Sequence, residues 1–137
     1  MHKILIVDDE FNNRKLLQQI LQHYGHCDMV VNGMEAVEIF EMAMDEGAPY
    51  TLVCLDIMMP EMDGQEALKR MRALEKDRQV PPSKESTVLM ITALDTPRDV
   101  IEAFYQGGCS DYLVKPVTGS KLVNKLTECG VLSERLS

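Results

Sequence analysis

The sequence predicts an α/β fold, in which a five-stranded parallel sheet is covered by helices on both faces. Short apolar runs recur along the chain and are bounded by turn residues, as expected of strands buried on both faces. Stretches with apolar residues at helical spacing separate these runs, so that strand and helix alternate five times. The predicted strands cover residues 4–7, 27–31, 52–55, 88–91 and 112–114, and the second is the weakest.

Composition fits one domain over residues 1–137 with no output domain. The chain is 45% hydrophobic and 26% charged, with a net charge of -8, which argues against a nucleic-acid-binding or anionic-membrane surface. No apolar stretch approaches the roughly 18 residues of a membrane span, and no signal peptide precedes the first strand. The four cysteines are scattered without a metal-binding spacing. A cytoplasmic protein without membrane insertion is expected.

The first half of the chain predicts two helices. Apolar residues recur at helical spacing over 16–24, and Gly25 is predicted to end this helix. Asn32 stands three residues before Glu35, a spacing typical of a capping box at the start of a second helix.

The second half predicts three more helices. A third starts at Asp63. A fourth has Thr96 as its N-cap and Pro97 as its first residue, where the missing N–H of proline costs nothing. A fifth starts at Thr118 or Ser120. Residues 74–86, rich in charge and proline, are predicted to be an exposed, loosely ordered connection.

Right-handed crossovers and five strands favour the order 2-1-3-4-5, that is, a flavodoxin-like (βα)5 three-layer sandwich. In such sheets ligands bind outside the carboxyl ends of the strands, where the order reverses between strands one and three. The side chains expected at this edge are Asp8, Asp9, Asp56, Thr92 and Lys115.

These carboxylates can hold a divalent cation. Mg²⁺ binds through one or two carboxylates and keeps several waters, and Mn²⁺ is an alternative. Asp9 and Asp56 are the expected direct ligands, with the backbone carbonyl of Met58 as a third. Asp8 would act through water or directly. Without the cation, repulsion between the acids should raise at least one pKa.

The same edge can hold a phosphoryl group. A carboxylate can act as a nucleophile and become an aspartyl phosphate, a reaction that needs positioning and charge neutralisation. Lys115 offers an ammonium and Thr92 a hydroxyl. Taken singly, each residue has a simpler explanation as a solvated turn, a strand end or a surface charge. The specificity lies in their joint placement after four strands.

At this point the chain resembles the receiver domain of response regulators, the CheY-like phosphoacceptor module of bacterial two-component signalling. The motifs are Val-Asp-Asp at 7–9, Asp-Ile-Met-Met-Pro-Glu-Met-Asp-Gly at 56–64, Thr-Ala at 92–93 and Tyr-Leu-Val-Lys-Pro at 112–116. The resemblance implies that Asp56 accepts a phosphoryl group from a phosphohistidine. The donor would be a sensor histidine kinase or a histidine phosphotransfer domain.

The resemblance also implies a conformational switch. Thr92 and Ala93 would move toward the phosphoryl group, Tyr112 would turn inward behind them, and the Lys115–Pro116 bond would be cis. A downstream target protein would bind the face made by the fourth helix, the fifth strand and the fifth helix. A phosphorelay intermediate and a contact regulator are both compatible with the sequence.

Met58 and Leu94 flank the expected phosphoryl group, and both are apolar. We expect them to exclude the attacking water and to prolong the phosphorylated state. Two other functions are alternatives: a degenerate receiver that only binds proteins, and a phosphatase of the haloacid dehalogenase type. The phosphatase family expects a second Asp where Met58 stands, and the filled acceptor site argues against degeneracy.

Overall fold

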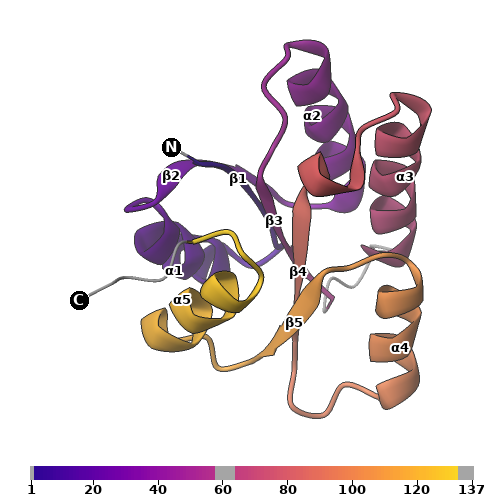
Figure 1. Cartoon of the computed structure of the whole chain (residues 1–137). Helices are drawn as coiled ribbons and strands as arrows, with labels where there is room; N and C mark the ends of the chain where they lie inside the picture. Colours follow the sequence, from indigo (N-terminus) through magenta and orange to yellow (C-terminus); the bar gives the residue numbers. More distant parts are fainter. Residues whose placement is uncertain (1, 58–63, 133–137) are drawn as a thin grey trace.

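The computed structural model describes residues 2–57 and 64–132, which form a five-stranded sheet with helices on both faces (Figure 1). The strands are β1 (His2–Val7), β2 (Gly25–Val30), β3 (Leu52–Asp56), β4 (Thr87–Thr92) and β5 (Asp111–Val114). The helices are α1 (Phe11–Leu21), α2 (Gly33–Asp45), α3 (Gly64–Asp77), α4 (Arg98–Gln106) and α5 (Gly119–Glu128), with a short 3-10 helix η1 (Pro82–Lys84). The predicted alternation and fold class are confirmed.

The strand order is β2-β1-β3-β4-β5, and every neighbouring pair is parallel, as predicted. The register places Val7 beside Leu55 and Thr92 beside Val114. The carboxyl ends of four strands therefore lie at one edge of the sheet, and the polar residues that follow them are brought to that edge.

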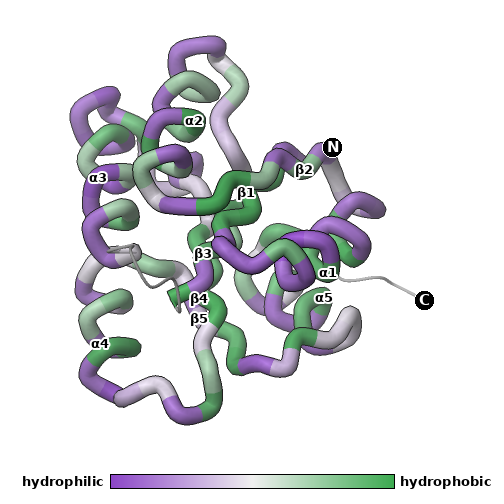
Figure 2. The backbone as a smooth tube through the Cα atoms, turned by 180° about the vertical axis from the view of Figure 1, so that it is seen from behind, coloured by the Kyte–Doolittle hydropathy of each residue, from purple (hydrophilic) through white to green (hydrophobic). Residues whose placement is uncertain are grey.

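Two hydrophobic cores lie on opposite faces of the sheet. One packs α2, α3 and α4 against the sheet and includes Phe40, Met71 and Phe104, and the other packs α1 and α5 and includes Leu21 and Leu122. Figure 2 shows hydrophobic segments in the central strands, whereas the helices alternate between hydrophobic and hydrophilic segments. Such alternation is expected of helices with one buried face. No helix within the described ranges is long and apolar enough to cross a membrane.

The prediction that Gly25 ends the first helix was wrong. Helix α1 ends at Leu21, and Gly25 is the first residue of β2, which thus starts earlier than the predicted residue 27. A Cβ built at Gly25 would lie 2.0 Å from the carbonyl oxygen of His2. The glycine therefore allows β2 to approach β1 closely, and this requirement is invisible to a pattern search along the chain.

The predicted start of the fourth helix was also wrong. Pro97, not Thr96, occupies the N-cap position of α4, and no side chain within residues 2–57 and 64–132 caps this helix. The Thr96 hydroxyl instead accepts a hydrogen bond of 3.0 Å from the backbone N–H of Ala93, within the loop that precedes the helix. A threonine before a proline can serve either purpose, so the sequence pattern did not distinguish them.

The other predicted caps were right where the structure describes them. Asn32 accepts a bond of 2.9 Å from Glu35 N at the start of α2, and Thr118 accepts one of 3.2 Å from Lys121 N at the start of α5. Asp63, the predicted start of α3, lies outside the described residues. Residues 74–86 were predicted to be a loose connection, but they include the last turn of α3 and η1, and they end at a buried residue, Ser86.

Candidate functional site

The structure brings three acidic side chains together at the carboxyl edge of the sheet. Asp8 and Asp9 follow β1, and Asp56 is the last residue of β3. One carboxylate oxygen from each lies within 4.8 Å of the others. Asp8 and Asp56 are buried, with exposed fractions of 1% and 2%, whereas Asp9 is exposed. The cluster is thus open to solvent on the side of Asp9.

Lys115 faces the same cluster from the loop after β5. Its ammonium Nζ lies 3.0 Å from Asp56 Oδ2, and its backbone N–H donates to the carbonyl of Thr92 at 2.7 Å. The Lys115–Pro116 bond is cis, as the resemblance implied. A cation held at this distance from a buried carboxylate neutralises part of its charge.

The electrostatics of the cluster centre on Asp8. The pKa of Asp8 is raised to about 7, and burial is the largest cause. A hydrogen bond between protonated Asp8 and Asp56, and the repulsion between the two carboxylates, raise it further. The backbone N–H of Glu10, which donates to Asp8 Oδ1 at 2.8 Å, and the charge of Lys115 oppose this rise in pKa. The expectation that crowding would raise one pKa among these acids agrees with this result.

Arg14 also contacts this cluster, and it was not among the residues predicted from the sequence. Its guanidinium donates a hydrogen bond of 2.8 Å to the backbone carbonyl of Asp8 and lies 5.8 Å from the ring centroid of Phe11. Arg14 therefore holds the loop that carries the two acids. Its position near the start of a helix beside acidic residues was the available signal, but the contact is with a backbone atom, which no side-chain pattern shows.

When the acids are ionised, two buried oxygens in the described ranges lack a hydrogen-bond partner, and both are here: Asp8 Oδ2 and Thr92 Oγ1. Buried polar atoms are nearly always paired, so two unpaired oxygens in one cluster indicate a place where a ligand can bind. A divalent cation is a partner for a carboxylate oxygen, and an anionic oxygen is a partner for a hydroxyl. The donor set of three carboxylates therefore fits a hard cation such as Mg²⁺.

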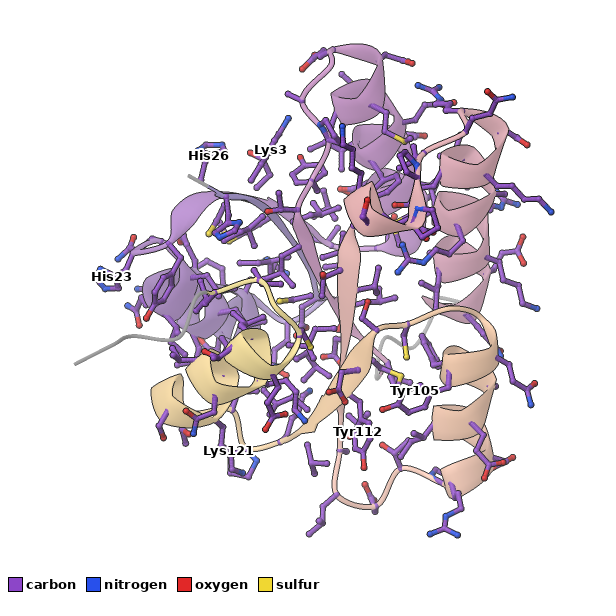
Figure 3. All side chains as sticks on the ribbon, in the orientation of Figure 1. Lys3, His23, His26, Tyr105, Tyr112 and Lys121 are labelled. Atoms are coloured by element: carbon purple, nitrogen blue, oxygen red, sulfur yellow. The ribbon has the colours of Figure 1, made fainter. Side chains whose placement is uncertain are left out.

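The remaining predicted site residues come from β5 and from the loop before α4, except for one. Tyr112 of β5 is half-buried and packs edge-on against Tyr105 of α4, with ring centroids 5.9 Å apart (Figure 3). Ala93 follows Thr92 in the loop before α4, and Leu94 next to it is 87% exposed. Met58, predicted to supply a carbonyl ligand, lies outside the described residues.

A mainly apolar cavity of about 550 Å³ adjoins the cluster. It reaches from Asp8 and Lys115 to Leu16 on α1, Leu94 and Pro116. The acidic cluster is therefore flanked by apolar side chains from α1 and from the loops after β4 and β5.

The family model described as the response regulator receiver domain matches residues 4–127. The chain belongs to this family. Receiver domains act in two-component phosphorelay systems, where they interact with histidine kinases or phosphotransfer proteins, and they are signalling proteins rather than conventional enzymes. An aspartyl phosphate and bound Mg²⁺ are typical of the family. The resemblance and the fold class inferred from the sequence are confirmed, and the phosphatase alternative has no support.

Two curated relatives illustrate the family. The chain is 33% identical over 135 residues to the sensory/regulatory protein RpfC of Xanthomonas campestris, covering 98% of this chain and 17% of RpfC. It is 37% identical over 128 residues to hybrid signal transduction histidine kinase B of Dictyostelium discoideum, covering 90% of this chain and 6% of that protein. The receiver thus spans a small part of the length of these relatives.

Solved structures support the fold. The receiver domain of the Arabidopsis thaliana histidine kinase CKI1, in complex with Mg²⁺ and BeF₃⁻, matches with a TM-score of 0.78 and 24% identity, covering 96% of this chain and 91% of that one. Vibrio cholerae chemotaxis protein CheY4 matches with a TM-score of 0.73 and 27% identity, covering 94% and 98% of the two chains.

Proposed function

We propose that this receiver accepts a phosphoryl group on Asp56 from a phosphohistidine of a cytoplasmic histidine kinase or phosphotransfer domain. The observation that carries this proposal is the ion pair of 3.0 Å between Lys115 and the buried carboxylate of Asp56, beside two further acids. A buried carboxylate with one nearby ammonium and a cation-binding neighbour can act as a nucleophile toward phosphorus.

The transfer requires little covalent chemistry from the protein. A carboxylate oxygen of Asp56 bonds to phosphorus while the phosphorus–nitrogen bond of the phosphohistidine breaks, and the imidazole nitrogen keeps that electron pair. Lys115 is placed to pair with an oxygen of the transferred group, which carries negative charge through the reaction. Reversal of the same step would pass the group to another histidine, as a relay intermediate requires.

Asp9 and Asp56 would hold Mg²⁺ directly, with Asp8 binding directly or through water and the carbonyl of Met58 completing the protein ligands. Bound Mg²⁺ supplies positive charge that offsets the developing charge on the phosphoryl oxygens. The partnerless Asp8 Oδ2 supports this assignment. Because Asp8 has a raised pKa, binding of the cation should release a proton near neutral pH.

The signal would follow from Thr92. Its buried hydroxyl has no partner among the described residues, and a phosphoryl oxygen on Asp56 would provide one. Movement of Thr92 and Ala93 would shift the loop before α4, and Tyr112 would respond from β5. We propose that a target protein reads this change on the face formed by α4, β5 and α5, as in a two-state switch.

The proposed acceptor is tested by incubation with Mg²⁺ and acetyl phosphate followed by intact mass. One phosphoryl group should be gained by the wild-type protein and by Asp77→Ala, a matched variant with an exposed acid removed from α3. None should be gained by Asp56→Ala or with EDTA. Gain of the group by Asp56→Ala would refute the proposed acceptor. Transfer from phosphorylated histidine domains, and onward to others, then separates a relay intermediate from a contact regulator.

The lifetime of the phosphorylated state tests whether Met58 and Leu94 shield the phosphoryl group from water. Leu94 is exposed beside the site, so a polar residue there should help a water molecule reach the phosphorus atom. We expect Leu94→Asn and Met58→Asn to shorten the half-life of phosphorylated protein by about tenfold, equivalent to roughly 1.4 kcal/mol of barrier. An unchanged or longer half-life in both variants would show that these side chains do not shield the phosphoryl group.

A further inference from the structure

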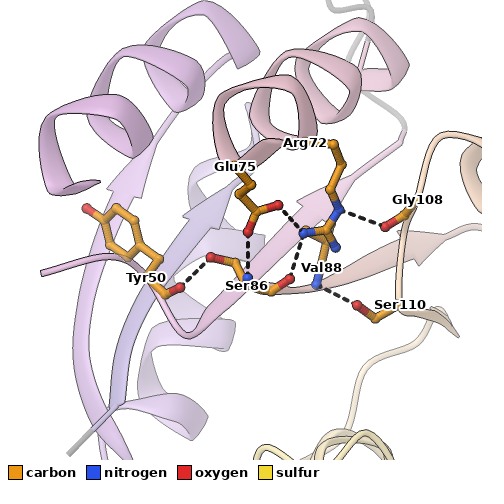
Figure 4. A network of polar contacts seen from close by, with 7 residues as sticks. All are labelled: Tyr50, Arg72, Glu75, Ser86, Val88, Gly108 and Ser110. Carbon is orange, nitrogen blue, oxygen red and sulfur yellow. Dashed lines mark hydrogen bonds and ion pairs between the residues drawn. The ribbon is translucent and has the colours of Figure 1, made fainter. Parts of the chain in front are cut away.

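A buried ion pair lies beside the amino-terminal end of β4, whereas the acidic cluster lies at the carboxyl ends of β1 and β3. Figure 4 shows the polar contacts of this pair. Arg72 and Glu75 come from α3, and their atoms Nη1 and Oε1 are 2.6 Å apart. Glu75 is 2% exposed, and the side chain of Arg72 is 19% exposed. A buried charged pair is costly unless further hydrogen bonds satisfy it, so the contacts around it show what it holds together.

The pair ties α3 to two other segments. Glu75 Oε2 accepts a bond of 2.7 Å from Ser86 N, and Arg72 Nη1 donates to Ser86 O at 2.9 Å, so both sides of Ser86 are bound just before β4. Arg72 Nε donates to Gly108 O at 2.9 Å, in the turn between α4 and β5. The Ser86 hydroxyl also donates to the backbone carbonyl of Tyr50. One guanidinium thus joins α3, the start of β4 and the end of α4.

Helix α4 is attached to α3 at its carboxyl-terminal end. Phe104, near this end, is buried. A Cβ built at Gly107 would lie 3.3 Å from Leu68 Cδ2, and one at Gly108 would lie 3.3 Å from Arg72 Cγ. Gly108 has a φ of 96°, which also favours glycine. The turn that follows α4 therefore packs closely on α3, and a side chain at either glycine would require its neighbour on α3 to shift by a few tenths of an ångström.

The other end of α4 is held less firmly. No side chain in the described part of the chain caps it. Arg98 and Asp99 are exposed, and Val100 and Ile101 are only half-buried. The preceding loop starts at Thr92 in the candidate site. The two ends of α4 thus differ: one follows the phosphoryl-sensing residue, and the other is bonded to a buried arginine.

We propose that the Arg72–Glu75 pair is the fulcrum of α4. This inference rests on the proposed function, because it concerns how α4 responds to a phosphoryl group on Asp56. Displacement of the loop at Thr92 moves the first turns of α4, while Arg72 keeps the turn at Gly108 in place. The helix then swings about its last turn rather than sliding along α3, and the change at the α4 and β5 face is confined to the half nearest the acidic site.

The anchor itself is tested without phosphate, by hydrogen exchange of the unphosphorylated protein. We expect Arg72→Gln to raise exchange of the amides in 103–110 by about tenfold, while amides in β1 and β3 stay protected. Arg70→Gln is the matched control, because Arg70 pairs with Glu66 on the exposed side of the same helix. If Arg72→Gln does not fold, Arg72→Lys replaces it, since lysine retains a charge beside Glu75 and lacks the planar fork. Equal exchange in the Arg72 and Arg70 variants would overturn the anchor.

The fulcrum is tested by the same measurement after phosphorylation with acetyl phosphate and Mg²⁺. In the wild type and in Arg70→Gln, exchange should change within 93–102 and stay the same within 103–110. In the Arg72 variant the change should extend through 103–110, although the protein takes up the phosphoryl group as fast as the wild type. Equal changes at both ends of α4 in the wild type would overturn the fulcrum. A wild type that takes up no phosphoryl group would instead refute the proposed function and leave the anchor test valid.

Discussion

Burial beside Asp56 gives Asp8 a pKa of about 7, against an ordinary value of 3.8. A raised pKa means that the folded state favours protonated Asp8. The stability that this preference provides is therefore complete below about pH 4 and is lost as pH rises through about 7. Bound Mg²⁺ reverses the preference, because the cation requires the ionised carboxylate.

The substitution Asp8→Asn should consequently stabilise the metal-free protein at about pH 8. We expect its melting temperature to exceed that of the wild type by on the order of 5 °C, with the difference vanishing toward pH 4. Addition of Mg²⁺ should raise the melting temperature of the wild type more than that of the variant. Thermal unfolding over pH and Mg²⁺ concentration measures both effects. A pH-independent difference would show that Asp8 is not the titrating group.

For single residues, the sequence predicted which side chains meet at the site better than it predicted the contacts that hold them in place. The positions of Asp56 and Lys115 after separate strands were enough to expect their meeting, and the ion pair of 3.0 Å agrees. Arg14 was missed because it binds a backbone carbonyl, and Arg72 because, apart from Glu75 on the same helix, its partners are backbone atoms of residues 86 and 108. Contacts between a side chain and a distant backbone leave no periodic or spaced pattern in the sequence.

Among the elements, β2 depends on one glycine. A methyl group at Gly25 would meet the carbonyl of His2 at 2.0 Å, so β1 and β2 would have to separate locally. We expect Gly25→Ala to destabilise the protein by well over the roughly 1 kcal/mol typical of single substitutions. Gly119→Ala is in a helical position where an added Cβ would meet no atom of the described residues within 4 Å, apart from its chain neighbours and its own helix backbone. This substitution should change stability little or increase it. Urea unfolding compares the two, and equal effects would refute the steric account.

The start of α2 depends on its cap. Asn32 accepts a hydrogen bond of 2.9 Å from Glu35 N, which would otherwise be unpaired at the first turn. Asn32→Ala should cost about 1 kcal/mol of unfolding free energy. Asn124→Ala, on an exposed position within α5, should cost none, because alanine favours a helix interior. Urea unfolding that ranks these two variants equally would argue against the cap.

The ends of helices and strands were predicted correctly where a residue has one structural role. They were missed where the same residue type can serve two roles. Asn32 has no rival role, and its cap was found. Thr96 precedes a proline and bonds within its own loop, so the cap was assigned wrongly. Gly25 offered both a helix stop and a close strand approach, and the fold uses the second.

For the whole molecule, topology determines the site. Strand–helix alternation and right-handed crossovers restrict the sheet to few orders, and the observed order places β1 beside β3. Asp8 and Asp56, 48 positions apart in the sequence numbering, become neighbours for this reason. The same topology separates the acidic edge from the buried pair of Arg72 and Glu75, and α4 connects the two regions.

The most direct test of the account is to locate the phosphoryl group chemically. Protein treated with Mg²⁺ and acetyl phosphate is reduced with borohydride, which converts an acyl phosphate into a primary alcohol, and its peptides are then mapped by mass. The account predicts homoserine at position 56 alone, and none when EDTA is present. Homoserine at position 8 or 9, or its formation at 56 without a divalent cation, would contradict it.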